Sequence, residues 1–140
     1  THRDPVSVTT SMVTMLAYTA RMSHDRVDVE GIGRYWADRL ERMLRRCAED
    51  RDALPAGQTI DVHFDEFMAD DLAMVARVYD LAGQPFDDTA RTAMTRFMAE
   101  HPRGKFGAVE YDLAGLGLER AALRRQMNFY TERFGVTPES

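Results

Sequence analysis

Residues 1–11 read THRDPVSVTTS and predict a helix that starts at Pro5, preceded by a strand end if residues 1–3 are extended. The Asp4 side chain can accept hydrogen bonds from the unpaired N–H groups of a helix start, and Pro5 suits the first helical position because its missing N–H would have no partner there. Arg3 would then lie beside a helix N-terminus, which attracts anions through its free N–H groups and the helix dipole. Ser11 can reach the same ligand only if that ligand lies along the side of the helix. The stretch therefore indicates an anion site, although Arg-Asp-Pro alone is also typical of a capped helix start with a surface salt bridge.

The composition is that of a globular protein: 140 residues, 44% of them hydrophobic and 29% charged, with a formal net charge of −5. This length predicts one domain or an incomplete piece of a larger one, and the lack of an initiator methionine favours a piece. The acidic balance argues against binding of long nucleic acid. A single cysteine excludes an internal disulfide and favours a reducing cytoplasm. Neither a membrane span nor export is expected, because the sequence has no apolar run of about 18 residues and no signal-peptide layout.

Apolar spacings of three and four residues predict that helices dominate the chain. After Pro5, the apolar stripe Val8, Met12, Met15 and Leu16 is expected to be the buried face of the first helix. The one convincing strand is TIDVHF at residues 59–64, where apolar and polar residues alternate. Because a lone strand leaves its backbone groups unpaired, we expect its partners to come from residues outside this sequence or from another chain. The further helices are predicted at residues 29–50, 71–82, 86–100 and 118–134.

A second anion site is predicted in the loop HPRGKFG at residues 101–107. Gly104 lets backbone N–H groups approach an oxyanion, and Arg103 and Lys105 add positive charge on either side of it. The loop is not a Walker A motif, because the upstream glycine is missing and Phe106 stands where a Ser or Thr would bind magnesium. The alternative is a glycine turn with solvated cations.

No metal site is expected. His63, Asp65 and Glu66 are metal-ligating residue types, but adjacent strand residues point to opposite faces and no second cluster has suitable spacing. A structural role for His63 is therefore the better interpretation.

The chain carries a series of motifs in a fixed order: Arg3 with Ser11 eight residues later, FDEF at 64–67, LAGQPF at 81–86, RGKFG at 103–107 and YDLAGLGL at 111–118. This series resembles the sulfotransferase family, which uses 3'-phosphoadenosine 5'-phosphosulfate (PAPS), and in particular its actinobacterial branch. The resemblance implies an α/β fold similar to that of the P-loop nucleotide kinases. Residues 1–140 would be a single incomplete domain, namely the C-terminal, mostly helical portion with few strands.

The resemblance also implies a reaction, in which a sulfuryl group passes from PAPS to an acceptor hydroxyl and leaves adenosine 3',5'-bisphosphate. Phe64 would pack near the adenine, and the 3'-phosphate would be held by Arg3, Ser11, Arg103, Gly104 and Lys105. In the family, the loop that holds the 5'-phosphosulfate and the catalytic base both lie upstream, so the catalytic residues stay unassigned. The implied partners are the missing N-terminal part of the same protein and a small-molecule acceptor, while a homo-oligomer is left open. Alone, the chain is expected to be inactive.

Two other functions are compatible with the same residues. The first is a helical binding or interaction module that keeps the scaffold without its chemistry. The second is a nucleotide or phosphometabolite kinase on a related fold. Stabilisation by adenosine 3',5'-bisphosphate, with ATP as the control, would separate them.

Overall fold

The structure is a computed structural model that describes residues 1–102, 104, 107 and 111–139. The chain forms two compact units. The first unit comprises Thr1–His2 and Ala53–Val109, and the second comprises Arg3–Asp52 and Glu110–Ser140. The described residues are mostly helical, and no described helix is both long and apolar enough to cross a membrane.

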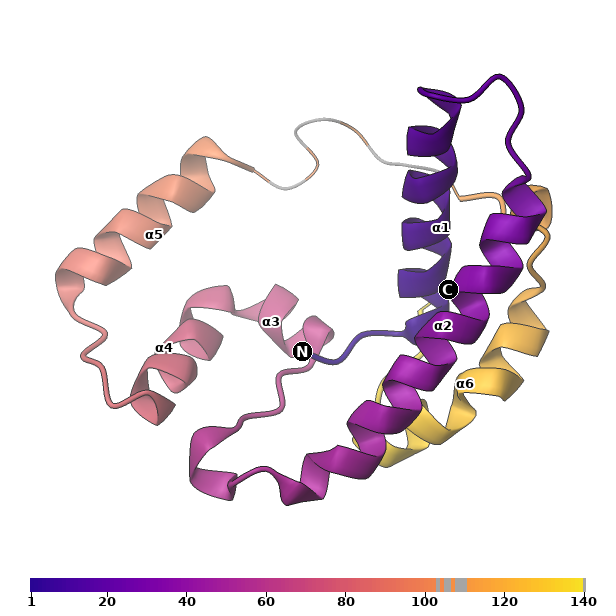
Figure 1. Ribbon diagram of the computed structural model, residues 1–140. Helices are drawn as coiled ribbons and strands as arrows, with labels where there is room; N and C mark the ends of the chain where they lie inside the picture. The colour runs from indigo at the N-terminus through magenta and orange to yellow at the C-terminus, as the bar shows by residue number, and fades with distance from the viewer. Residues whose placement is uncertain (103, 105–106, 108–110, 140) are drawn as a thin grey trace. The chain divides into compact units, whose positions relative to one another are not determined.

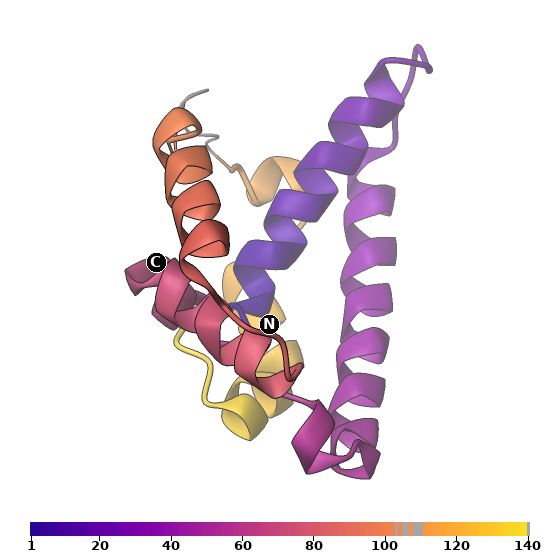
Figure 2. The same cartoon turned by 90° about the vertical axis from the view of Figure 1, so that its left-hand side faces the viewer.

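The second unit is built on three long helices, α1 (Pro5–Arg21), α2 (Val29–Asp50) and α6 (Arg120–Phe134), together with the short 3-10 helix η3 (Ala114–Leu116). The three helices pack against one another and lie side by side in both views (Figures 1 and 2). The centre of the unit contains one residue or two from each of them, namely Val6, Ala37, Leu123 and Met127. Gly33 of α2 is buried against the carbonyl of Leu116, so a glycine is needed where η3 approaches the helix.

Local capping residues set the helix ends as the sequence predicts. The Asp4 carboxylate accepts a hydrogen bond from the Val6 N–H at 3.0 Å, and Pro5 occupies the first turn of α1. Asp28 caps α2 by accepting from the Gly31 N–H at 2.8 Å. The C-terminal end of α6 lies at Gly135, whose φ of +62° is a left-handed conformation that glycine adopts readily. These ends depend on residues within one turn, so they are readable from sequence.

The predicted buried face of α1 is wrong. Val8 and Met15 are 37% and 60% exposed, whereas Thr9 and Thr10 are buried. Each threonine hydroxyl donates to the backbone carbonyl four residues earlier at 2.7 Å, which satisfies its polar group inside the core. The helix is therefore rotated relative to the expected apolar stripe, because short polar side chains that bond to their own backbone can be buried.

The first unit contains the short helix α3 (Phe64–Ala69) followed by α4 (Asp71–Leu81) and α5 (Asp88–Glu100), with a 3-10 turn η2 (Ala56–Gln58) upstream. Another 3-10 turn, η1 (Arg51–Ala53), follows α2 directly. The α4 and α5 helices match the predicted spans closely and contact each other. Asp70 and Asp87 cap them through hydrogen bonds to the N–H groups of Ala73 and Ala90.

The predicted strand at residues 59–64 is reduced to a single β-bridge in the part of the chain that the structure describes. His2 pairs in parallel with His63, its N–H donating to the Val62 carbonyl at 2.7 Å and its carbonyl accepting from the Phe64 N–H at 2.8 Å. One partner of this segment therefore lies within the chain, and its expected pairing with residues outside the chain stays a prediction. Phe64 already begins α3, so the extended segment ends one residue earlier than expected.

Candidate functional site

Arg3, which directly precedes the cap of α1, holds a carboxylate. Its Nε donates to Oε1 of Glu139 at 2.7 Å, and its Nη2 donates to Oε2 at 2.8 Å. This is the two-bond fork by which a guanidinium recognises the paired oxygens of a carboxylate or a phosphate. The hydrogen bond to Glu139 is the main reason why the pKa of Arg3 is raised. Arg3 is therefore placed to bind a planar pair of anionic oxygens.

The backbone of Glu139 is fastened as well as its side chain. Its N–H donates to Oδ2 of the buried Asp4 at 2.8 Å, and its carbonyl accepts from Nη2 of Arg124 at 2.6 Å. The pKa of Glu139 lies below its ordinary value, mainly because Arg3 hydrogen-bonds the carboxylate, with a smaller contribution from the Ser7 hydroxyl; burial opposes this shift. An ionised carboxylate is thus held beside the start of α1.

Hydroxyl groups extend this site along one side of α1. Ser7 and Ser11 lie one turn apart in α1, which places their hydroxyls on one face of the helix, and Arg3 directly precedes its cap. The Ser11 Oγ lies 3.1 Å from the Tyr111 hydroxyl, a hydrogen-bonding distance. Tyr111 also contributes electrostatically to the raised pKa of Arg3, so the phenol lies near the guanidinium. We call these residues the α1 donor cluster: Arg3, Ser7, Ser11 and Tyr111.

The other predicted ligands lie in the first unit or outside the described residues. Phe64 is the half-buried first residue of α3. Gly104 has a φ of +75°, and its carbonyl accepts from the Gly107 N–H at 2.9 Å, which makes a glycine turn. Arg103 and Lys105 fall outside the described residues. That this loop and Arg3 share one phosphate stays a prediction.

Comparison with known proteins now identifies the family. The family model described as the sulfotransferase family matches residues 1–88, which is more than half of the chain. The chain belongs to the sulfotransferase family. Its fold is similar to the crystal structure of sulfotransferase STF9 from Mycobacterium avium, with a TM-score of 0.84 at 23% sequence identity. The match covers 99% of this chain and 36% of that one, so the chain spans about a third of that protein's length. A search of curated proteins found no match.

The family resemblance seen in the sequence is thereby confirmed. Sequence reasoning found Arg3 and Ser11 but missed the other two members and the bound carboxylate. Ser7 was accessible from spacing, because it lies four residues from both Arg3 and Ser11. Nothing in the sequence places Tyr111 or Glu139 beside α1, since they lie about 100 and 136 residues away from their partners.

His2 has a structural place in this sulfotransferase chain. It is buried, and its Nε2 lies 2.9 Å from Oδ1 of Asp61, while its ring centroid is 5.6 Å from that of His63. These contacts hold the extended segment at the bridge. Within the described residues, no three His, Cys, Asp or Glu side chains are grouped so that they could hold a metal ion.

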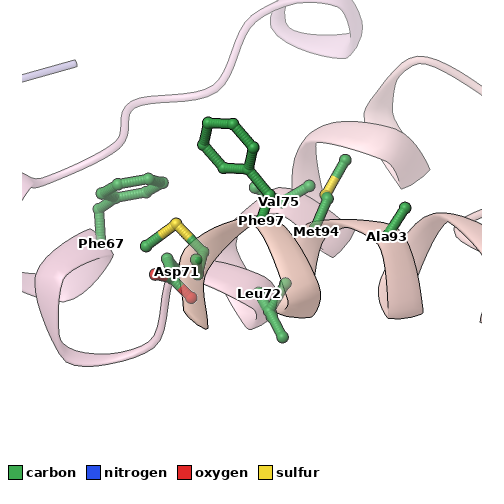
Figure 3. A pocket seen from close by; sticks show the side chains of 8 residues that line it. Phe67, Asp71, Leu72, Val75, Ala93, Met94 and Phe97 are labelled. Carbon is green, nitrogen blue, oxygen red and sulfur yellow. The ribbon is translucent and has the colours of Figure 1, made fainter. Parts of the chain in front are cut away.

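An apolar pocket of about 400 Å³ opens in the first unit between α4 and α5. Figure 3 shows side chains of α3, α4 and α5 around it, among them Phe67 and Phe97. Among the described residues that line this pocket, Asp71 alone is charged. The volume is within the range of small-molecule pockets, but the lining offers few polar groups to orient a ligand.

Proposed function

We propose that this chain is the C-terminal, nucleotide-closing part of an enzyme that transfers the sulfuryl group of PAPS to the hydroxyl of a small-molecule acceptor. The observation that carries the proposal is the Arg3 fork, which holds two anionic oxygens at the start of α1 in a chain of the sulfotransferase family. The spacing of Arg3 and Ser11 is that of the family's 3'-phosphate ligands.

In the proposed reaction, a bond forms between the acceptor oxygen and sulfur, and the bond between sulfur and the oxygen of the 5'-phosphate breaks. The acceptor proton passes to a base, and adenosine 3',5'-bisphosphate leaves. Such a transfer depends chiefly on positioning and on stabilising charge on the transferred group and the leaving oxygen. Residues of this chain serve the positioning: Arg3 and Ser11 hold the 3'-phosphate.

The remaining assignments complete the nucleotide site. Arg103, Gly104 and Lys105 close over the 3'-phosphate, and Phe64 packs near the adenine. The loop that holds the 5'-phosphosulfate and the catalytic base belong to the upstream part of the protein, within a P-loop-kinase-like α/β domain. The 140-residue chain alone should therefore form no sulfated product from PAPS, which a radiolabelled-sulfate transfer assay would detect.

A ligand-stabilisation experiment on the complete protein tests the proposal. Adenosine 3',5'-bisphosphate at a hundred times its Kd should stabilise the folded state by about 2.7 kcal/mol, because it binds that state alone. The melting temperature should rise with this nucleotide and stay unchanged with ATP. A rise with ATP alone would favour a kinase instead, and no rise with either nucleotide would favour a non-catalytic module.

A further inference from the structure

We propose that the Glu139 carboxylate is a built-in competitor for the 3'-phosphate, so the nucleotide binds Arg3 only when Glu139 releases it. The inference rests on the proposed function, since it takes the ligand of Arg3 to be that phosphate. It assigns to the segment that follows α6 a regulatory role at the donor site.

The competition follows from the geometry of the fork. Both the Nε and the Nη2 of Arg3 donate to Glu139, one to each carboxylate oxygen. A phosphate that binds with two bonds to this Nε–Nη2 edge of the guanidinium needs the same two donors. Ser7 also contributes to holding the Glu139 carboxylate. The two anions therefore exclude each other at this fork.

To release Arg3, only the side chain of Glu139 has to move. The backbone of Glu139 is anchored independently of Arg3, through Asp4 and Arg124. Val136, earlier in the segment, is buried. Rotation of the Glu139 side chain would thus break its two hydrogen bonds to Arg3 while the segment stays docked on the helices.

The strength of the competition is set by the exposure of the pair. The side chains of Arg3 and Glu139 are 38% and 36% exposed, and ion pairs exposed to this extent are weak. A nucleotide that binds a fractionally open site loses affinity in proportion to the open fraction. Converting the energy of such a pair to affinity gives an expected penalty of about two- to fivefold. Glu139 therefore tunes nucleotide affinity and does not abolish binding.

The test measures the Kd of adenosine 3',5'-bisphosphate by calorimetry in the complete protein and its variants. Glu139→Gln removes the charge at nearly constant shape and should tighten binding about two- to fivefold. Glu139→Ala should tighten it as well. Glu132→Gln is the matched control, because Glu132 is an exposed α6 glutamate bonded to Asn128 and its change should leave the Kd as it is. Adenosine 5'-phosphosulfate, which lacks the 3'-phosphate, should bind all variants equally.

Two failures are distinguishable. If Arg3→Ala does not weaken binding of the bisphosphate, the proposed function of this site is wrong. If Arg3→Ala weakens binding while both Glu139 variants bind no more tightly than the parent, the site stands and the competition is refuted. Circular dichroism and melting temperature of each variant ensure that only folded proteins are compared. When Glu139→Gln is added to the Arg3→Ala variant, it should no longer tighten binding of the bisphosphate, because no guanidinium is left for Glu139 to release.

Discussion

Replacing Arg3 by alanine should separate its contribution to binding from its contribution to folding. Within the described residues the substitution removes the ion pair with Glu139, whose two side chains are each more than a third exposed, and a pair of this kind contributes at most about 1 kcal/mol. For a chain of this size, such a loss lowers the melting temperature by only about 3–5 °C. The domain should therefore remain folded.

The same substitution should act strongly on the nucleotide. A hydrogen bond to a charged group contributes on the order of 1.5–3 kcal/mol, which corresponds to a loss of roughly ten- to hundredfold in affinity for adenosine 3',5'-bisphosphate.

Calorimetry on the complete protein measures the affinity for the nucleotide, and thermal unfolding of the same variants measures the stability of the fold. Adenosine 5'-phosphosulfate should bind the Arg3→Ala variant as it binds the parent, because it lacks the 3'-phosphate. Arg133→Ala is the matched control, since Arg133 pairs with Asp52 in the same unit and its side chain is 43% exposed, close to the 38% of Arg3. An equal loss of both ligands would indicate general damage, and unchanged binding of the bisphosphate would refute the assignment of Arg3.

Three further predictions concern the stability of the second unit. Met127→Ala should lower the unfolding free energy by roughly 2–5 kcal/mol in urea titrations, since its side chain is completely buried; a loss below 1 kcal/mol would contradict this. Gly33→Ala should cost about 1–3 kcal/mol, because the new Cβ would collide with the Leu116 carbonyl, and an unchanged melting temperature would refute the close approach. The pKa of Glu139 is depressed below its ordinary 4.5 by Arg3, so the pair stabilises the fold above that pH. This stability should disappear as the pH falls through the lower folded pKa, and Glu139→Gln should show a shallower acid dependence than the parent.

Local chemistry made the helices predictable. The span 29–50 coincides with α2, and the starts of α1, α4 and α5 are each fixed by an aspartate cap, all within one turn of sequence. Which face of a helix is buried is a tertiary property, and there the prediction for α1 failed. Thr9 and Thr10 take core positions by bonding to their own backbone, while Val8 and Met15 remain exposed. The pattern of apolar residues alone does not predict that threonines are buried while apolar side chains of the same helix are exposed.

The single β-bridge could have been inferred more fully. A strand was predicted at residues 59–64, and residues 1–3 were considered as the end of another, so the two segments were candidates to pair. The structure pairs them at His2 and His63. The sequence of two short segments far apart in the chain does not determine which of their residues pair, however, so the register could be learned only from the structure.

Two of the four residues of the α1 donor cluster, Arg3 and Ser11, were predicted from the sequence. They were predicted from the helix start at Pro5 and from the spacing that resembles the family's motif. Glu139 is 136 residues from Arg3, and its meeting with the guanidinium depends on the packing of α6 and the segment after it. The occupant of the fork is therefore visible only in three dimensions.

A crystal structure of the complete protein with adenosine 3',5'-bisphosphate tests the central claim most directly. We predict 3'-phosphate oxygens about 2.7–3.0 Å from Nε or Nη2 of Arg3 and from Oγ of Ser11, with the Glu139 carboxylate turned away. A nucleotide bound with its 3'-phosphate elsewhere, while Arg3 and Glu139 remain paired, would contradict the account.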